Sequence, residues 1–388
     1  QRARIFQTVE DLYTQSYVLP FLVPMLENAG ANVLMPRERD SQIAEVVVDN
    51  DGCLHSRSVY TEKIGDKNWM QGTGEGFAHL RDQYINFENP FREGTFRTVE
   101  TVKGKKEKES TAEWIPELPS TGQYAVYVSY KSLPNSTDDA LYTVYHKGGV
   151  SQFKVNQQMG GGTWIYLGTF GFDAGKSNAG KVFNTGPLPF FRVEKAGKHA
   201  VFHTGKSNAG KVVLSNRSEK AGRIVTADAV KIGGGMGNMA RRISDAGATE
   251  NIKSSDGNAA IVHKEMPKID YPYEISGYPR FCEAARYWLQ WAGIPDSVYS
   301  DSQGKNDYTD DYKCRGIWVN YLAGGSTVNP TEQGLNIPVD MAFAFHSDAG
   351  TTLNDSIIGT LGIYYTNVYN EESVSYTHLR AHETGRNL

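Results

Sequence analysis

The pattern of apolar and polar residues divides the chain into three stretches, with changes near residues 76 and 237. In the first stretch, apolar residues recur at near-helical spacing over residues 1–30, where a glycine marks the stop. Residues 31–35 and 45–48 are apolar runs that predict two short buried strands, with a charged loop between them. Because helix and strand follow each other, residues 1–75 are predicted to form the first part of an α/β layer.

The middle stretch, residues 76–236, consists of short alternating segments that are separated by Gly, Asn and Pro turns. The predicted strands cover residues 122–130, 141–146, 151–155, 163–168, 212–214 and 224–230. Regularly spaced short strands with such turns are typical of an all-β sandwich.

The third stretch, residues 237–372, returns to the α/β pattern. Residues 281–291 predict an amphipathic helix, which a polar loop over residues 301–311 follows. The apolar run 341–345 predicts a buried strand that ends abruptly at His346. An all-β block between two α/β stretches predicts an inserted domain.

Composition narrows the class of protein. The 388 residues, with 39% hydrophobic and 22% charged side chains, indicate a soluble globular protein of more than one domain. A net charge of −4 gives no basic surface for nucleic acid. The longest apolar run, residues 17–26, contains two prolines and is too short to cross a bilayer. Three scattered cysteines do not make a disulfide scaffold, and 22 tyrosines among small polar residues are typical of secreted, saccharide-binding β domains.

Two segments are expected not to belong to the natural fold. Residues 175–182 and 205–212 share the sequence GKSNAGKV, which favours a duplication or a chimeric join and makes 183–211 a duplicated or foreign piece. Neither copy has the earlier glycine of a phosphate-binding loop. Residues 375–384 resemble a translated sequencing adapter, so 373–388 are predicted to be an artefact.

Two motifs could hold a metal ion. His346 lies at a predicted strand exit, and histidine is the commonest metal ligand, although a loop carbonyl could equally satisfy its imidazole. Residues 49–52, Asp-Asn-Asp-Gly, begin like a calcium loop. They lack the distal glutamate at the required spacing, so a simple turn is predicted there.

The middle stretch resembles golvesin-like domains, which are β-sandwiches of bacterial extracellular enzymes and also occur beside polysaccharide lyases. The resemblance rests on residues 113–116, 122–124, 161–170 and 227–230. Trp114 and Trp164 could stack on sugar rings, but this pattern favours a place in the sandwich core.

The flanking stretches resemble the zinc-dependent N-acetylmuramoyl-L-alanine amidases. The resemblance rests on residues 9–12, 26–30, 32–37 with Asp40, 345–349 and 362–365. It implies an incomplete α/β amidase-like layer, of the phosphorylase/hydrolase-like class, interrupted by the sandwich. Glu10 and His346 would be two of three zinc ligands, with Asp11 as the alternative if the register shifts by one. The third ligand and the catalytic glutamate would lie beyond the two ends, so we expect a truncated, inactive fragment.

This resemblance also implies a mechanism. Zn²⁺ with an open coordination position lowers the pKa of bound water to about 7, and the hydroxide would attack the muramoyl–L-alanine amide. Asp348 could orient the His346 imidazole or cap the following turn, and both roles stay open.

The expected function is therefore that of a peptidoglycan amidase, secreted or in the periplasm of a bacterium, with its signal peptide lost. The alternatives are a glycan-binding or adhesive envelope protein without catalysis, and an accessory region of a polysaccharide-degrading enzyme.

Overall fold

The computed structural model describes most of the chain in two compact units, residues 1–343 and 344–388. Described are residues 14, 18–54, 57–81, 84, 87–104, 106–176, 201–203, 210–237, 278–327, 329–344, 361–362 and 379–380. In the second unit, β16 (Leu361–Gly362) pairs with β17 (Leu379–Arg380) in antiparallel orientation. The other described elements belong to the first unit.

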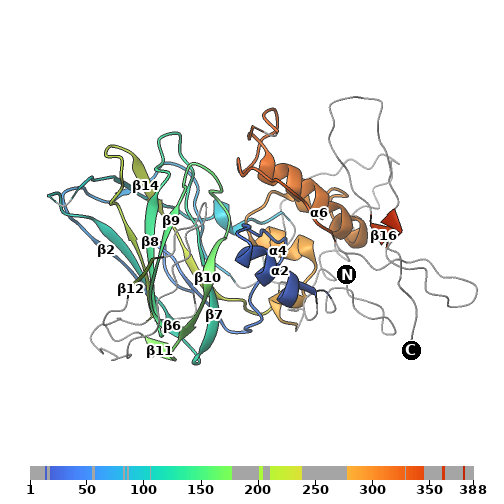
Figure 1. Cartoon of the computed structure of the whole chain (residues 1–388), viewed down its shortest axis with the longest axis horizontal. Helices are drawn as coiled ribbons and strands as arrows, with labels where there is room; N and C mark the ends of the chain where they lie inside the picture. Colours follow the sequence, from blue (N-terminus) through green and yellow to red (C-terminus); the bar gives the residue numbers. More distant parts are fainter. Residues whose placement is uncertain are drawn as a thin grey trace, which may run out of the picture. The chain divides into compact units, whose positions relative to one another are not determined.

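Two antiparallel sheets form a β-sandwich in the first unit (Figure 1). The six-stranded sheet has the order β12 (Val201–His203), β9 (Gly149–Val155), β8 (Ala140–His146), β13 (Lys211–Ser215), β5 (Thr111–Ile115) and β2 (Val59–Lys63). The four-stranded sheet has the order β1 (Glu45–Val48), β15 (Val230–Gly233), β7 (Gly122–Val128) and β10 (Ile165–Phe172). Smaller sheets contain β3 (Met70–Gln71), β4 (Arg97–Glu100) and β14 (Ile224–Ala227), and β6 (Glu117–Leu118) with β11 (Gly175–Lys176).

The core between the two sheets is built from alternate residues of their strands. Trp114, Tyr142 and Val212 of the six-stranded sheet belong to the same buried cluster as Tyr124 and Val126 of the four-stranded sheet. The predicted core position of Trp114 is confirmed, since this side chain is fully buried. The prediction of an all-β sandwich is therefore confirmed.

Helices cover the other face of the four-stranded sheet. They are α4 (Ala285–Trp291), α5 (Asp296–Tyr299) and α6 (Asp307–Ala323), preceded by the short 3-10 helix η3 (Arg280–Cys282). Val47, Ala125 and Tyr127 of the sheet form a second buried cluster with Trp288 and Trp291 of α4. All four residues of β15 are buried. This sheet is therefore covered on both faces, which explains why its strands are apolar in runs rather than in strict alternation.

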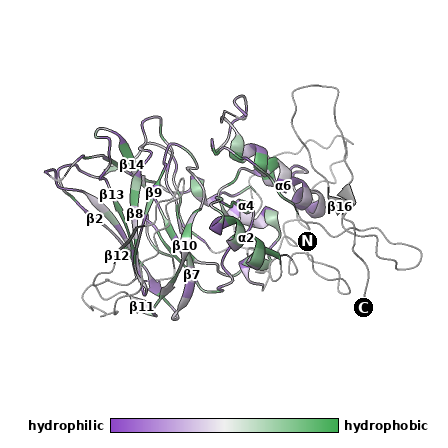
Figure 2. Cartoon of the chain, in the orientation of Figure 1, coloured by the Kyte–Doolittle hydropathy of each residue, from purple (hydrophilic) through white to green (hydrophobic). Residues whose placement is uncertain are grey.

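Two further helices come before this helical layer in the sequence. The first, α2 (Leu19–Asn28), confirms the predicted helix before Gly30, with a proline in its first turn. Figure 2 shows α2 mostly in the colour of hydrophobic residues, yet Phe21 and Met25 are exposed. The second is the 3-10 helix η2 (Pro90–Arg92), whose first amide is capped by Asn89.

The predicted strands of the sandwich are confirmed, with one interruption. The run predicted over residues 224–230 is divided into β14 and β15 by Asp228 and Ala229. Strands β1 and β2 precede residue 76, the predicted start of the inserted domain, yet they pair with β15 and β5.

Two predicted strands are wrong. Residues 31–35 and 341–344 form no strand, and Met341 and Phe343 are 76% and 68% exposed. In the described part of the chain neither run has a neighbouring strand with which to pair, and apolar composition alone does not make a strand. The α/β amidase-like layer stays a prediction.

The helical region after residue 278 differs in detail from its prediction. The helix predicted over residues 281–291 is divided into η3 and α4. The polar loop predicted over residues 301–311 ends earlier, because Asn306 Oδ1 accepts a hydrogen bond of 3.0 Å from the Thr309 amide and starts α6.

Candidate functional site

The predicted zinc site lies outside the described residues. Glu10 and its alternative Asp11 precede them, and His346 and Asp348 fall in an undescribed segment. In the described ranges, no group of three or more His, Cys, Asp or Glu side chains could hold a metal ion. The Zn²⁺ site and the role of Asp348 therefore stay predictions. No helix in these ranges is long and apolar enough to span a membrane.

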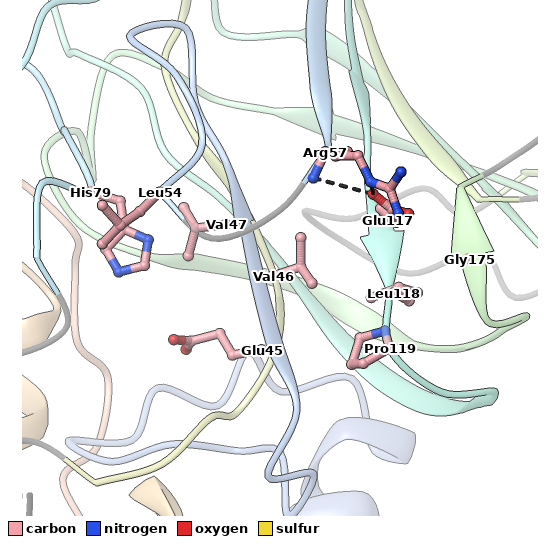
Figure 3. A pocket seen from close by; sticks show the side chains of 10 residues that line it. All are labelled: Glu45, Val46, Val47, Leu54, Arg57, His79, Glu117, Leu118, Pro119 and Gly175. Carbon is pink, nitrogen blue, oxygen red and sulfur yellow. Dashed lines mark hydrogen bonds and ion pairs between the residues drawn. The ribbon is translucent and has the colours of Figure 1, made fainter.

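A groove of about 760 Å³ lies beside strand β1. This volume is within the range of small-ligand sites, about 300–1,000 Å³. It is lined by Glu45, Val46, Val47, Leu54, Arg57, His79, Glu117, Leu118, Pro119 and Gly175 (Figure 3). In this view Glu45 and His79 lie on one side of the two valines, and Arg57 and Glu117 lie on the other. The sequence did not predict this site, because its residues come from segments that only the fold brings together.

An exposed ion pair forms one side of the groove. Arg57 Nε lies 3.3 Å from Glu117 Oε2, which also accepts a hydrogen bond of 3.2 Å from the Arg57 amide. The Arg57 side chain is 89% exposed. Solvent screening makes such a pair weak, so the guanidinium can exchange its partner for a ligand at little cost.

His79 lies on the other side, at the edge of an aromatic cluster. Its ring centroid is 5.6 Å from that of Trp291 in an edge-on arrangement, and 6.5 Å from that of Phe77. Phe77 in turn contacts Trp164 edge-on at 4.8 Å, and Trp164 donates to the Trp291 carbonyl at 3.2 Å. The cluster therefore holds the imidazole in a fixed place. Trp164 is buried, as predicted, but in the cluster between the four-stranded sheet and the helices rather than in the sandwich core.

Glu45 brings a buried carboxylate to the groove. Its Oε1 accepts a hydrogen bond of 3.3 Å from Arg280 Nη2, while Lys231 Nζ lies 3.7 Å from its Oε2. Burial raises the pKa of Glu45 above its ordinary value, although the charges of Arg280 and Lys231 offset part of this rise. No hydrogen-bond donor from the described residues reaches Oε2.

Taken together, these groups can bind a ligand that carries polar groups. The groove offers a fixed carboxylate, an imidazole and an exchangeable guanidinium together with the exposed apolar side chains of Leu54 and Pro119. A few polar groups placed on an apolar wall are what orient a ligand that carries hydroxyl groups.

Comparison with known proteins shows which domain family the sandwich resembles. Residues 92–187 match the model of the Golvesin C-terminal domain. A xanthan lyase of Bacillus sp. (strain GL1) is 31% identical over 106 residues, which is 24% of this chain and 11% of that protein. The structure of a Paenibacillus xanthan lyase shares 23% identity, covers 49% of this chain and 13% of that one, and gives a TM-score of 0.30.

The chain thus spans about a tenth of the length of the xanthan lyases that it matches, 11% and 13%. No part of these comparisons shows the amidase family that the flanking stretches resemble, so that resemblance stays a prediction. The match over residues 92–187 confirms the other resemblance, and the β-sandwich of this chain is golvesin-like.

Proposed function

We propose that this chain is an accessory region of a secreted polysaccharide-degrading enzyme and that it binds the polysaccharide. The main support for this proposal is the golvesin-like match over residues 92–187, together with 31% identity to a protein named as a xanthan lyase. Of the functions that the sequence suggests, this one fits these relatives better than the amidase does.

The groove supports this proposal as the binding surface. Sugar hydroxyl groups need hydrogen-bond acceptors and donors in fixed places, and Glu45 and His79 are both held by buried neighbours. Arg57 adds a cationic group that would favour a carboxylate on the saccharide. Leu54 and Pro119, the exposed apolar residues of the groove, would contact the faces of sugar rings.

The test is retention of the purified chain in affinity gels that contain xanthan or, as a neutral probe, dextran. We expect retardation by at least one polysaccharide, and weaker retardation for Arg57→Ala and His79→Ala. Arg92→Ala is the matched control, because Arg92 is also an exposed ion-pair arginine, 3.9 Å from Glu75, and does not line the groove. A chain that no polysaccharide retards would overturn the proposal.

Equal retardation of the groove variants and the control would instead place binding elsewhere on the chain. The zinc amidase activity, with Glu10 and His346 as ligands, is a separate proposal.

A further inference from the structure

Two carboxylates are buried together in the sandwich. Asp49 follows the last residue of β1, and Asp228 lies between β14 and β15. Their exposed fractions are 1% and 2%. The Phe77 amide donates to both oxygens of Asp228, at 3.3 and 3.1 Å. Neither oxygen of Asp49 has a hydrogen-bond partner from the described residues.

Val48 pairs with Val230 across β1 and β15, so Asp49 and Asp228 lie at the same end of this ladder, and their charges interact. Burial raises the pKa of Asp49 well above its ordinary value, and the charges of Asp228 and Asp51 raise it further. The amides of Asn50 and Asp51 lower that pKa without reaching hydrogen-bond geometry. In the described part of the chain no lysine or arginine forms an ion pair with Asp49 or Asp228. A buried charge without a counter-charge is strongly unfavourable.

A third buried oxygen in this turn also has no donor. Asn50 Nδ2 donates to Thr95 Oγ1 at 3.0 Å, but no donor from the described residues reaches its Oδ1. The turn itself is closed by the Gly52 amide, which donates to the Asp49 carbonyl at 3.2 Å. Asp51 is already occupied, because its Oδ1 accepts from Thr95 Oγ1 at 2.7 Å. The oxygens that need a partner are therefore those of Asp49 and Asn50.

We propose that Asp49 and Asp228 bind one calcium ion, with the Asn50 amide oxygen, backbone carbonyls and water completing its shell. Calcium takes about six to eight oxygen ligands and accepts carboxylate, amide and carbonyl oxygens together. Zinc would need three or more nitrogen, sulfur or carboxylate side chains, a group that the described residues do not contain. This inference is independent of the proposed function.

A shared proton is the alternative that the test must separate. It would neutralise one of the two carboxylates, but a proton held between them leaves the Asn50 oxygen without a partner. The sequence Asp-Asn-Asp-Gly also begins like a calcium loop but lacks the distal acid at the required spacing. The fold supplies that acid from Asp228, on a segment far along the chain, where a search for a local spacing does not find it.

The test uses the full chain after removal of metal with EDTA. Terbium(III) takes calcium sites and emits when a nearby tryptophan is excited, and Trp114 Nε1 donates to the Asp228 carbonyl at 2.9 Å. We expect sensitised terbium emission that calcium chloride displaces, and a melting temperature that calcium raises by several degrees.

Asp49→Asn should abolish both effects, and Asp173→Asn, an exposed carboxylate with 42% of its side chain accessible, should change neither. Asp228→Asn is the second variant, in case the first one does not fold. Wild-type protein without terbium emission, stabilised by acid but unaffected by calcium, would overturn the proposal in favour of the shared proton.

Discussion

Lys231 Nζ lies 2.6 Å from Glu38 Oε2, and both side chains are completely buried. The ammonium group also lies 3.9 Å above the ring centre of Tyr127, whose hydroxyl donates to Glu38. Two residues on, Asp40 accepts a hydrogen bond of 2.6 Å from the Ala125 amide. The charged segment after α2 is therefore attached to β7 and β15 by polar contacts that water does not reach. This attachment gives the first prediction.

Lys231→Met should destabilise the protein by about 3–5 kcal/mol, because it leaves the buried Glu38 carboxylate without its counter-charge. Adding Glu38→Gln should recover part of the loss. Chemical denaturation followed by tryptophan fluorescence measures both. The exposed pair Lys147–Asp173, 3.0 Å apart, is the matched control, and Lys147→Met should cost less than about 1 kcal/mol. Equal losses at the two sites would contradict this account.

Stability should fall as the pH rises from about 4 to about 8. Burial, together with the nearby charge of Asp51, raises the pKa of Asp228 from 3.8 to about 8. Between these values the folded chain holds a proton that the unfolded chain has released, so each pH step favours unfolding. Urea denaturation in EDTA at several pH values measures the slope, and Asp228→Asn should flatten it. A slope that the variant keeps would assign the effect to other groups.

Trp291→Ala should destabilise the protein by about 3–5 kcal/mol, because a large buried side chain is lost and a cavity remains. The centroid of the Trp291 ring lies 6.0 Å from that of Phe77, 6.1 Å from that of Trp164 and 5.6 Å from that of Tyr84. The Arg280 guanidinium carbon lies 4.5 Å from the same centroid. The loss should be smaller for Trp291→Phe.

Because His79 packs against the same ring, Trp291→Ala should also weaken binding to the groove. Affinity gels at a temperature where the variant is still folded measure this effect. Unchanged binding would mean that His79 does not depend on the aromatic cluster.

If Glu10 and His346 are zinc ligands, a protein extended at its N-terminus so that it also carries the third ligand should contain zinc, and His346→Ala should lower that content. Elemental analysis after dialysis measures it, with His378→Ala as the control in the segment predicted to be an artefact. Muropeptide digestion with and without chelator tests the amidase itself in a longer protein that carries these residues. Zinc content that His346→Ala leaves unchanged would end this proposal.

The sandwich was predictable from the sequence because its strands are short and regularly spaced, and strands such as β9 alternate between buried and more exposed residues. The four-stranded sheet was harder to assign. It is covered on both faces, so β1 is a short apolar run that looks like part of an α/β layer. The burial of Asp228 is invisible in the sequence, and the run around it therefore looked like one continuous strand.

The groove could not be predicted, because its properties come from distant partners. In the sequence, His79 is not spaced from other histidines or acidic residues in a way that indicates a site. Its imidazole is positioned by Trp291, which only the fold brings near. Glu45 looks like the first residue of an apolar strand, and its contact with Arg280 follows from the packing of η3. The exposed run at 341–344 shows the opposite error, since apolarity without a partner strand does not produce a sheet.

The sheet covered on both faces has a consequence for how this module is inherited and dissected. The segment that matches the family, residues 92–187, contains β7 and β10 but lacks β15, which pairs with β7, and β1, which pairs with β15. It also lacks α4, whose tryptophans cover that sheet from outside. A gene fragment cut at the family boundaries would therefore encode half of this sheet, with the face that α4 covers open to water. The smallest unit that keeps this sheet buried contains all four of its strands, the six-stranded sheet on one face and α4 on the other.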